Sequence, residues 1–361
     1  MFLALRDLRF GRARFVLVGT VIGLVALLTT LLSGLATGLV DDGISGLRGL
    51  PLTHLALQPG AESSFSRSTL RPANLEPWTE ADGVEAAPLG VSFFNAKTED
   101  GETLDLAVFG TTPDSFLAPN ATARGALAGE PGIVVSEELR GQGVEVGDEL
   151  TIVGPDQTLP VLGFTYTGSY GHVDIAFTSL EEWQHLVYGD DADGRFSAVA
   201  LRGGDAEVRA AADRAASTAT ETKAHAYAGS PGYSAETATM TLIRVFLLAI
   251  SALVVGAFFT VWTIQRTRQI GLLKALGASN GYVLRDSLGQ LAIVLVAATA
   301  AGAGAAVAVG QLVGDEVPFS LQAGPVATSA VVLVVLGLAG SLVAVRKVTS
   351  VDPVIALGAE H

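Results

Sequence analysis

Four long apolar stretches constrain this sequence more than any other feature. They carry no formal charge except Arg244, and they cover residues 15–40, 240–264, 287–313 and 325–345. A transmembrane helix needs about 20 predominantly apolar residues to cross the hydrocarbon layer of a bilayer. Core helices of a soluble domain are rarely this long and this apolar, because one face usually meets water. We therefore predict four transmembrane helices.

The first stretch differs from a cleaved signal peptide. Its apolar run extends to residue 40, which is too long for the apolar core of a signal sequence. It also holds glycines at four-residue spacing, namely Gly19, Gly23, Gly34 and Gly38. Such spacing lets membrane helices approach closely, although glycine is also common in membrane helices generally. We interpret the stretch as a retained helix at a subunit interface.

Basic residues are distributed unevenly around the four stretches. Residues 1–14 form a basic amphipathic segment, the linker 265–286 has four basic residues, and two more begin the tail 346–361. The linker 314–324 has neither Lys nor Arg. Lys and Arg next to membrane spans favour the cytoplasmic side. The sequence thus predicts that both termini and residues 265–286 are cytoplasmic, while residues 41–236 and 314–324 lie outside.

Residues 41–236 form a large acidic segment, with 30 Asp and Glu against 11 Lys and Arg. This balance speaks against nucleic-acid binding, which needs a basic face, and is only weak evidence for a cationic partner. From residue 132 onward, alternating apolar runs predict strands, and "EEWQHLV" after Ser179 predicts a capped helix. "ETKAHAY" is predicted as a last strand, and residues 41–130 are less regular. We expect an α+β membrane protein with a large mixed α/β extracytoplasmic domain between its first and second helices.

No catalytic or metal-binding motif is present in the sequence. A phosphate-binding P-loop, a G-x-S-x-G nucleophile motif and cysteine are all absent. "GAGAAV" at 302–307 matches part of a dinucleotide fingerprint, but its place in an apolar stretch favours close helix packing. The five histidines are isolated, and we interpret His172 and His185 as ordinary surface or core residues. The chain is thus predicted not to be an enzyme by itself, with no metal site and no permanently bound cofactor.

A short amphipathic segment, "RTRQIGLLKALGAS", joins the second and third apolar stretches. Lys274 lies on one side of the predicted helix, and four apolar residues fall near another face: Ile270, Leu272, Leu273 and Leu276. A partner protein can bind such a helix in a groove through its apolar side chains. The same pattern also fits a helix that lies on the lipid surface.

The order of these segments resembles the permease subunits of the MacB/FtsX-like family of ABC transporters, also called type VII or mechanotransmission transporters. The resemblance covers essentially the whole chain and is strongest in "QIGLLKALGAS" at 269–279 and "DPVIAL" at 352–357. Gly358 stands where the family commonly has arginine. The resemblance implies a permease homodimer in the bacterial cell (inner) membrane, working with two copies of a separate ABC ATPase that binds ATP. It also implies that the segment around Lys274 and Gly277 is the coupling helix that meets the ATPase.

The stretch "AGSPGYSAETATMTLIRVF" at 228–246 is similar to the DevC/HrtB-like branch of this family, whose HrtB members export haem. The resemblance therefore implies efflux of haem, or of a similar hydrophobic compound, from the membrane by ATP-driven mechanotransmission. Export of other hydrophobic compounds or peptides, and lipoprotein handling, are alternatives. A different class also stays open, namely an FtsX-like signalling subunit that activates a cell-wall hydrolase, or a sensor of antimicrobial peptides.

Haem as a substrate requires an apolar slot, an iron ligand and a partner for its propionates. Histidine, methionine and tyrosine bind haem iron in proteins. Five candidates lie near the outer ends of the first two predicted helices: Arg48, His54, Tyr233, Glu236 and Met240. Glu236 and Met240 are four residues apart and would share one helical face. The alternative for each residue is a plain structural role as a cap, an interface anchor or a packing residue.

Overall fold

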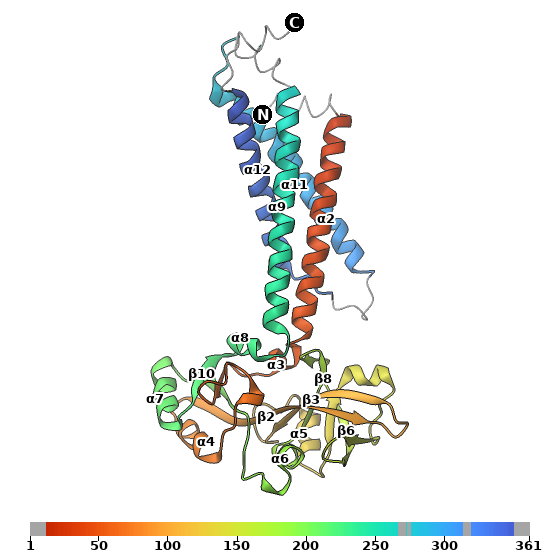
Figure 1. The fold of residues 1–361 in the computed structure, drawn as a ribbon, viewed down its shortest axis with the longest axis vertical. Coiled ribbons are helices and arrows are strands. Elements are labelled where there is room, and N and C mark those ends of the chain that lie inside the picture. The colour runs from red at the N-terminus through yellow and green to blue at the C-terminus, as the bar shows by residue number, and fades with distance from the viewer. Residues whose placement is uncertain (1–11, 266–271, 273–275, 313–318, 350–361) are drawn as a thin grey trace. The chain divides into compact units, whose positions relative to one another are not determined.

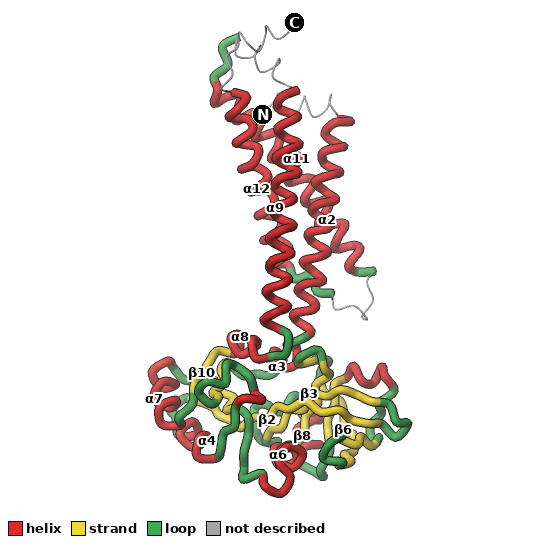
Figure 2. Tube along the Cα trace, in the orientation of Figure 1, coloured by secondary structure: helices red, strands yellow, loops and turns green. Residues whose placement is uncertain are grey.

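The computed structural model describes residues 12–265, 272, 276–312 and 319–349. The chain divides into two compact units. Met1–Leu39 and Ala238–His361 form what we call the helical unit, and Val40–Thr237 form the sheet unit. All of the described strands belong to the sheet unit (Figure 2).

Four long helices carry the apolar stretches (Figure 1): α2 (Arg12–Asp42), α9 (Tyr233–Gln265), α11 (Asn280–Gly310) and α12 (Ala323–Thr349). Within the described residues, three spans are long and apolar enough to cross a membrane, namely Phe15–Asp42, Tyr233–Phe258 and Leu284–Gly310. The apolar part of α12 covers only Val326–Gly340 by the same measure. Three of the four expected membrane spans therefore have the required length and composition, and the fourth is not confirmed.

The helices begin and end at residues other than those indicated by the sequence. α9 begins at Tyr233 rather than at 240, so its first turns belong to the segment expected to be extracytoplasmic. α11 begins at Asn280, inside the expected linker 265–286, because the Ser279 hydroxyl caps it by accepting a hydrogen bond from the Tyr282 amide at 3.2 Å. Hydropathy alone misses such boundaries, because the first turn of a helix is often polar.

Glycine permits close packing inside the helical unit. A Cβ atom at Gly302 would overlap the backbone of Gly23, so α11 and α2 approach each other with no room for a side chain. Gly34 lies against the side chains of Phe319 and Leu321. The close contacts of Gly23 and Gly34 are thus made within the chain, and the prediction that the first helix lies at a subunit interface stays a prediction.

The sheet unit is built on one ten-stranded mixed sheet in the order β10-β1-β9-β2-β3-β8-β4-β6-β5, with β7 added to β8. Its strands are β1 (His54–Leu57), β2 (Val84–Lys97), β3 (Thr103–Thr111), β4 (Ile133–Ser136), β5 (Glu149–Ile152), β6 (Gln157–Thr165), β7 (Ser169–Tyr170), β8 (Val173–Ser179), β9 (Ala198–Gly203) and β10 (Ala219–Thr222). β3 and β8 pair in parallel, as do β4 and β6, and the other pairs are antiparallel.

The sheet closes partly on itself. The far end of β2 pairs with β5, Ala96 opposite Ile152, in addition to its pairing with β3 along most of its length. Strands β2, β3, β8, β4, β6 and β5 thus form a ring, and β9, β1 and β10 continue the sheet beyond β2. Six α-helices accompany it: α3 (Ser45–Gly49), α4 (Pro72–Thr79), α5 (Ala121–Leu127), α6 (Leu180–Tyr188), α7 (Ala206–Ala216) and α8 (Lys223–Ala226).

The mixed α/β character predicted from the sequence is confirmed, with two local corrections. The long strands β2 and β3 come from residues 41–130, in which the sequence indicated less regular structure. "ETKAHAY" is not one strand, because β10 ends at Thr222 and the helix α8 follows. The Thr222 hydroxyl caps α8 by accepting a hydrogen bond from the His225 amide at 3.2 Å.

The helix predicted after Ser179 is confirmed as α6. The Ser179 hydroxyl accepts a hydrogen bond from the Glu182 amide at 3.1 Å, which is the expected cap. α6 presents Trp183 to the sheet, where Gly90 of β2 and Gly110 of β3 stand directly opposite each other. A Cβ atom at either glycine would overlap Trp183, so the pair forms a flat seat for this fully buried side chain.

Candidate functional site at the junction of α2 and α9 with the sheet

Three ionisable side chains from distant parts of the chain meet in the sheet unit. His172 lies in the turn between β7 and β8, Asp42 is the last residue of α2, and Glu236 lies in the first turn of α9. His172 Nδ1 is 2.9 Å from Asp42 Oδ2, and Nε2 is 2.9 Å from Glu236 Oε1. We call these three residues the neck triad. One imidazole thus links the end of α2 to the start of α9.

The β7–β8 turn holds His172 in an uncommon backbone conformation. Tyr170 pairs with Val173, so the turn consists only of Gly171 and His172. Both residues have a positive φ, 64° and 61°, as two-residue hairpin turns of type I′ require. Glycine adopts this conformation easily, but histidine does so at a cost. A strained non-glycine residue that makes two specific contacts is a candidate for function.

Hydroxyl groups fix the backbone around the neck triad. The Ser169 hydroxyl donates to Asp42 Oδ1 at 2.8 Å, which orients this carboxylate. The Ser230 hydroxyl donates to the Gly43 carbonyl at 2.7 Å and accepts from the Gly171 amide at 3.1 Å. The same amide also donates to the Gly43 carbonyl, at 2.8 Å. The chain leaving α2 is therefore fastened to the hairpin that carries the histidine.

A second polar group of residues forms around the helix α3. Arg48 makes an ion pair with Asp41 at 2.6 Å, and the Lys223 ammonium donates to the Arg48 carbonyl at 2.5 Å. Burial and the charge of Arg48 lower the pKa of Lys223. Tyr227 packs edge-on against Tyr233, with ring centroids 6.2 Å apart, and burial raises the pKa of Tyr227. Cationic, anionic and phenolic groups thus gather beside the chain segments that enter and leave the sheet unit.

Two groups near the neck titrate at shifted pKa values. Burial lowers the pKa of His172, but the hydrogen bonds and negative charges of Asp42 and Glu236 outweigh burial, so the pKa is raised. Burial and the charge of Glu138 raise the pKa of Asp174, on β8, to about 6. Asp42 contributes to both shifts, because its charge favours the proton on either neighbour.

Stability of the sheet unit should therefore fall as the pH rises. The stabilisation from protonated His172 is complete below about pH 6.5, the unfolded value, and is lost as the pH rises through the raised folded pKa. Protonated Asp174 stabilises fully below its unfolded pKa of 3.8, and this contribution is lost as the pH rises through about 6. We expect His172→Gln to remove the pH dependence above 6.5 and Asp174→Asn to remove that between 4 and 6, as estimated from these same pKa values.

The measurement is protease resistance of residues 40–237 in the full-length protein over a temperature ramp at several pH values. Glu99→Gln, in the exposed turn between β2 and β3, is the control carboxylate. A wild-type profile that rises with pH through this range would contradict the assignment.

The structure distributes the five haem candidates over different surroundings. Glu236 belongs to the neck triad, while Arg48 and Tyr233 belong to the second polar group. His54 begins β1, with Nδ1 3.0 Å from the Thr53 hydroxyl, and burial and the charge of Arg209 lower its pKa. Met240 belongs to the helical unit.

His172 is the functional candidate that sequence reasoning missed. Its place in the sequence predicts an ordinary surface or core residue, but its imidazole hydrogen-bonds two carboxylates. Its partners Asp42 and Glu236 are far away in sequence, and no spacing pattern connects them. The tight turn "YGHV" at 170–173 is the only local signal, since Gly followed by a polar residue between apolar residues favours a hairpin turn.

The predicted coupling helix falls partly outside the described residues. Ile270, Leu273 and Lys274 lie outside them. The Leu276 amide donates to the Leu272 carbonyl at 3.0 Å, as in one turn of α-helix, and both side chains are exposed, at 78% and 57% respectively. Gly277 follows with a φ of 95°, the left-handed conformation that often ends a helix.

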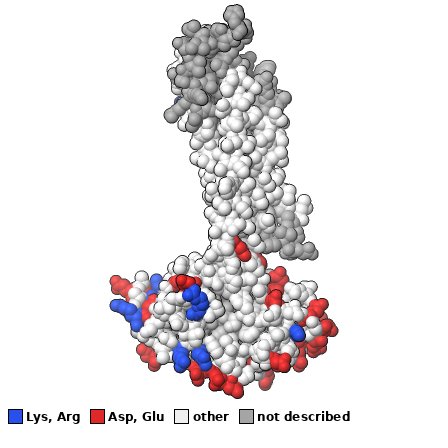
Figure 3. All heavy atoms as spheres, in the orientation of Figure 1, with Lys and Arg blue, Asp and Glu red and all other residues white. Residues whose placement is uncertain are grey.

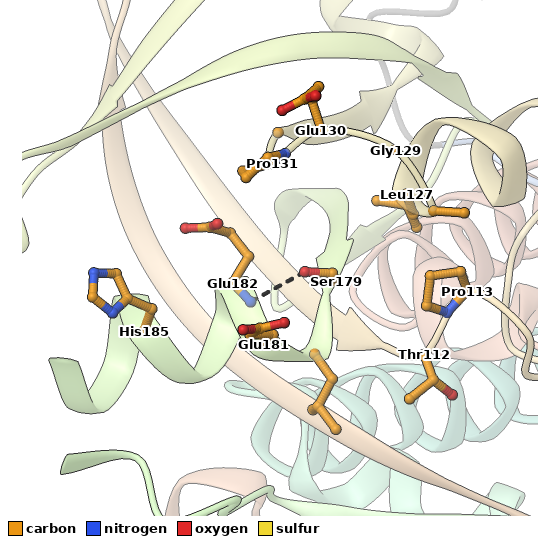
Figure 4. A pocket seen from close by; sticks show the side chains of 13 residues that line it. Thr112, Pro113, Leu127, Gly129, Glu130, Pro131, Ser179, Glu181, Glu182 and His185 are labelled. Carbon is orange, nitrogen blue, oxygen red and sulfur yellow. Dashed lines mark hydrogen bonds between the residues drawn. The ribbon is translucent and has the colours of Figure 1, made fainter. Parts of the chain in front are cut away.

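The sheet unit also has a cavity of about 530 Å³ beside the N-terminus of α6. Figure 4 shows Glu130, Glu181, Glu182 and His185 around it, with apolar groups such as Leu127 on another side. The Glu182 carboxylate accepts a hydrogen bond from the Gln157 amide group. The carboxylates suit a ligand with a cationic group. None of the five haem candidates lines this cavity.

Charge is distributed very differently over the two units. In the view of Figure 3, Asp and Glu predominate over Lys and Arg on the sheet unit, while the described surface of the helical unit is almost free of both. Many large apolar side chains of α2, α9 and α11 are exposed, for example Leu253 at 72%. An apolar surface of this kind belongs in lipid or against another membrane protein.

Comparisons with known proteins agree with a membrane transport subunit. Residues 241–353 match the family model described as FtsX-like permease C-terminal. Over 99% of both chains, the sequence is 27% identical to a protein of Staphylococcus haemolyticus and 23% identical to one of Staphylococcus epidermidis, both named "Putative hemin transport system permease protein HrtB". It is also 25% identical, over 99% of both chains, to an uncharacterised ABC transporter permease of Mycobacterium bovis.

Two solved structures are similar to about half of this chain. The extracellular domain of the ABC-type transporter YknZ from Gram-positive bacteria has 13% identity and a TM-score of 0.34, covering 47% of this chain and 98% of that one. The periplasmic region of MacB from Actinobacillus actinomycetemcomitans has 10% identity and a TM-score of 0.36, covering 51% of this chain and 94% of that one.

Together, the apolar helices and the family match define a membrane-embedded permease. More specifically, residues 241–353 form an FtsX-like permease domain, and the chain is similar over its full length to proteins named HrtB hemin transport permeases.

Proposed function

We propose that this chain is the permease subunit of an ABC-type transporter that exports haem, or a similar hydrophobic compound, from the membrane. The observation that carries the proposal is the similarity to proteins named as hemin transport permeases, which extends over 99% of both chains and so includes the sheet unit. Tyr233 and Glu236 support it, because they place a phenol and a carboxyl group in the first turn of α9, whose later residues are apolar.

The neck triad suits a device that transmits motion between helices and sheet. His172 bonds Asp42 on one side and Glu236 on the other, so α2 and α9 do not move separately at this point without breaking a contact. We propose that two copies of a separate ATPase bind the 265–286 segment of a permease homodimer. ATP-driven movement then passes along α2 and α9 to the sheet unit, as rigid helices transmit displacement.

The proposed orientation places the sheet unit outside the cell and both termini in the cytoplasm. The reason is the uneven distribution of Lys and Arg around the apolar stretches. The chain has no cysteine, so a single introduced cysteine reports one position. Glu99→Cys should react with a membrane-impermeant maleimide in intact cells, and Leu276→Cys only after permeabilisation. Labelling of Leu276→Cys in intact cells, and of Glu99→Cys only after permeabilisation, would show the opposite topology.

Hemin binding tests the substrate. We expect the purified full-length permease to give a saturable Soret shift when hemin is added. Tyr233→Ala, Glu236→Ala and Met240→Ala, which remove the candidate iron ligands, should include at least one variant whose affinity is lower by about tenfold, roughly 1.4 kcal/mol. Glu99→Ala, at an exposed position of the sheet unit, is the matched control.

The structure refines how a change at Glu236 is interpreted. Since Glu236 is bonded to His172, its removal also frees the imidazole. His172→Gln distinguishes the two effects, because it releases Glu236 without removing the carboxylate. Wild-type protein without a saturable Soret shift would reject haem as the substrate and favour another hydrophobic cargo or an FtsX-like signalling role. If all three alanine variants bind hemin as the wild type does, haem remains the proposed substrate but binds at another site.

A further inference from the structure

Arg244 is a charged side chain within the apolar part of α9. It lies inside the span Tyr233–Phe258, which is apolar enough to cross a membrane. The residues around it on α9 are exposed and apolar, among them Ile243 and Val245. Arginine stays protonated in proteins, so this helix carries a permanent positive charge. Placing such a charge in a membrane costs about 2.5–3.5 kcal/mol at the bilayer centre on insertion scales, and such residues usually serve a function.

Among the described residues, the hydrogen-bond partners of Arg244 are neutral. Its Nη2 donates to the Thr37 hydroxyl at 2.9 Å and to the Ser33 carbonyl at 3.2 Å, both on α2. The Thr37 hydroxyl donates its own proton to the Ser33 carbonyl at 2.8 Å, which leaves its oxygen lone pairs to accept from the guanidinium. These bonds hold one side of the guanidinium against α2 without compensating its charge.

The remaining donors of Arg244 are not used by a carboxylate. Within the parts of the chain that the structure describes, no Asp or Glu forms an ion pair with it. Its Nε is buried and has no hydrogen-bond partner. On the same face of α2, one turn before Ser33, the buried Thr29 hydroxyl also lacks a hydrogen-bond partner. Buried donors without partners are uncommon and call for an explanation.

We propose that Arg244 binds the anionic group, a carboxylate or a phosphate, of an amphiphile that lies in the membrane. A guanidinium presents parallel N–H donors that match the two oxygens of either group. The bonds from Nη2 to α2 fix its orientation, and the exposed apolar side chains of α9 suit the apolar body of the ligand. Thr37 is then a positioning residue, because it acts on the ligand only through Arg244.

The carboxylate form of this inference rests on the proposed haem function, because haem carries two propionates, while the phosphate form does not. Binding of hemin is compared with binding of hemin dimethyl ester to test whether Arg244 recognises the propionates. Esterification removes both carboxylates and leaves the iron and ring. Phosphatidylglycerol and phosphatidylcholine separate anionic from net-neutral headgroups in the lipid arm, read by native mass spectrometry of the full-length permease.

We expect Arg244→Gln, which retains polar hydrogen bonding but removes the charge, to weaken hemin binding by about tenfold or more and to leave binding of the dimethyl ester unchanged. Arg244→Lys should retain most of the hemin affinity, because it keeps the charge. Thr37→Val should weaken hemin binding less than Arg244→Gln does, again without affecting the ester. Elution of each variant as wild type in size exclusion controls for folding.

Loss of preferential phosphatidylglycerol retention in Arg244→Gln, with hemin binding unchanged, would support the site with a lipid phosphate as its ligand. If the wild type binds no hemin, the haem proposal fails and the lipid arm alone decides this inference. Unchanged hemin affinity together with unchanged lipid retention in Arg244→Gln would overturn it, as would a wild-type protein that prefers neither anionic ligand.

Discussion

Leu276→Asp is expected to abolish co-purification of the permease with the proposed ATPase partner, while the permease itself still inserts into the membrane. Leu276 is 78% exposed and Leu272 is 57% exposed, one helical turn before it. Leu272 and Leu276 together therefore present an exposed apolar surface. In a complex, that surface would be buried against the ATPase. A carboxylate buried there without a partner costs several kcal/mol, enough to dissociate a typical docked helix.

The matched control is Leu276→Met, which keeps the apolar volume. Gly277→Trp is less informative, because Gly277 has a φ of 95° and any side chain there is strained whether or not a partner is bound. The measurement is affinity purification of tagged permease followed by quantification of the bound ATPase and of ATP hydrolysis. Full complex formation by Leu276→Asp would show that this turn lies on lipid, the alternative for a basic amphipathic helix.

The helices could be predicted from the sequence because hydropathy is a local property. The spans that contain Gly23 and Arg244 are visible as runs without other charges. The ends of the helices were not predictable in the same way. α11 begins at Asn280 because Ser279 caps it, and hydropathy gives no information about a capping hydroxyl. α9 begins at Tyr233 rather than at 240. Hydropathy did not indicate its first turns, because they are polar.

The candidate site was predicted only in part, because its contacts are non-local. Glu236 was singled out for its place at the start of a helix, and the structure gives it a partner, His172, from a hairpin. The β2–β3 pair was missed for a similar reason. β2 contains Pro88 and Gly90, which weaken its strand pattern, yet Gly90 is required for the seat of Trp183. A residue whose role depends on a distant neighbour gives no periodic signal.

The same glycine gives the second large effect. Gly90→Val is expected to destabilise the sheet unit strongly, although valine favours strands and the backbone conformation tolerates it. Its side chain would overlap Trp183, a buried indole that also covers Gly110 on the neighbouring strand. Overpacking of this kind typically costs about 1–3 kcal/mol. It should exceed that here, because the clash is with a ring held between helix and sheet rather than with a flexible side-chain end.

Gly163→Val is the matched control, since Gly163 also lies in a strand and a Cβ there meets nothing within 4 Å. The measurement is protease resistance of residues 40–237 in full-length protein over a temperature ramp. A double-mutant cycle makes the cause specific. Trp183→Ala alone should cost about 3–5 kcal/mol, but Gly90→Val added to it should cost much less than in the wild type, because the ring that it overlaps is gone. Equal costs of Gly90→Val in both backgrounds would mean that the close approach of β2 to Trp183 does not determine the stability of this unit.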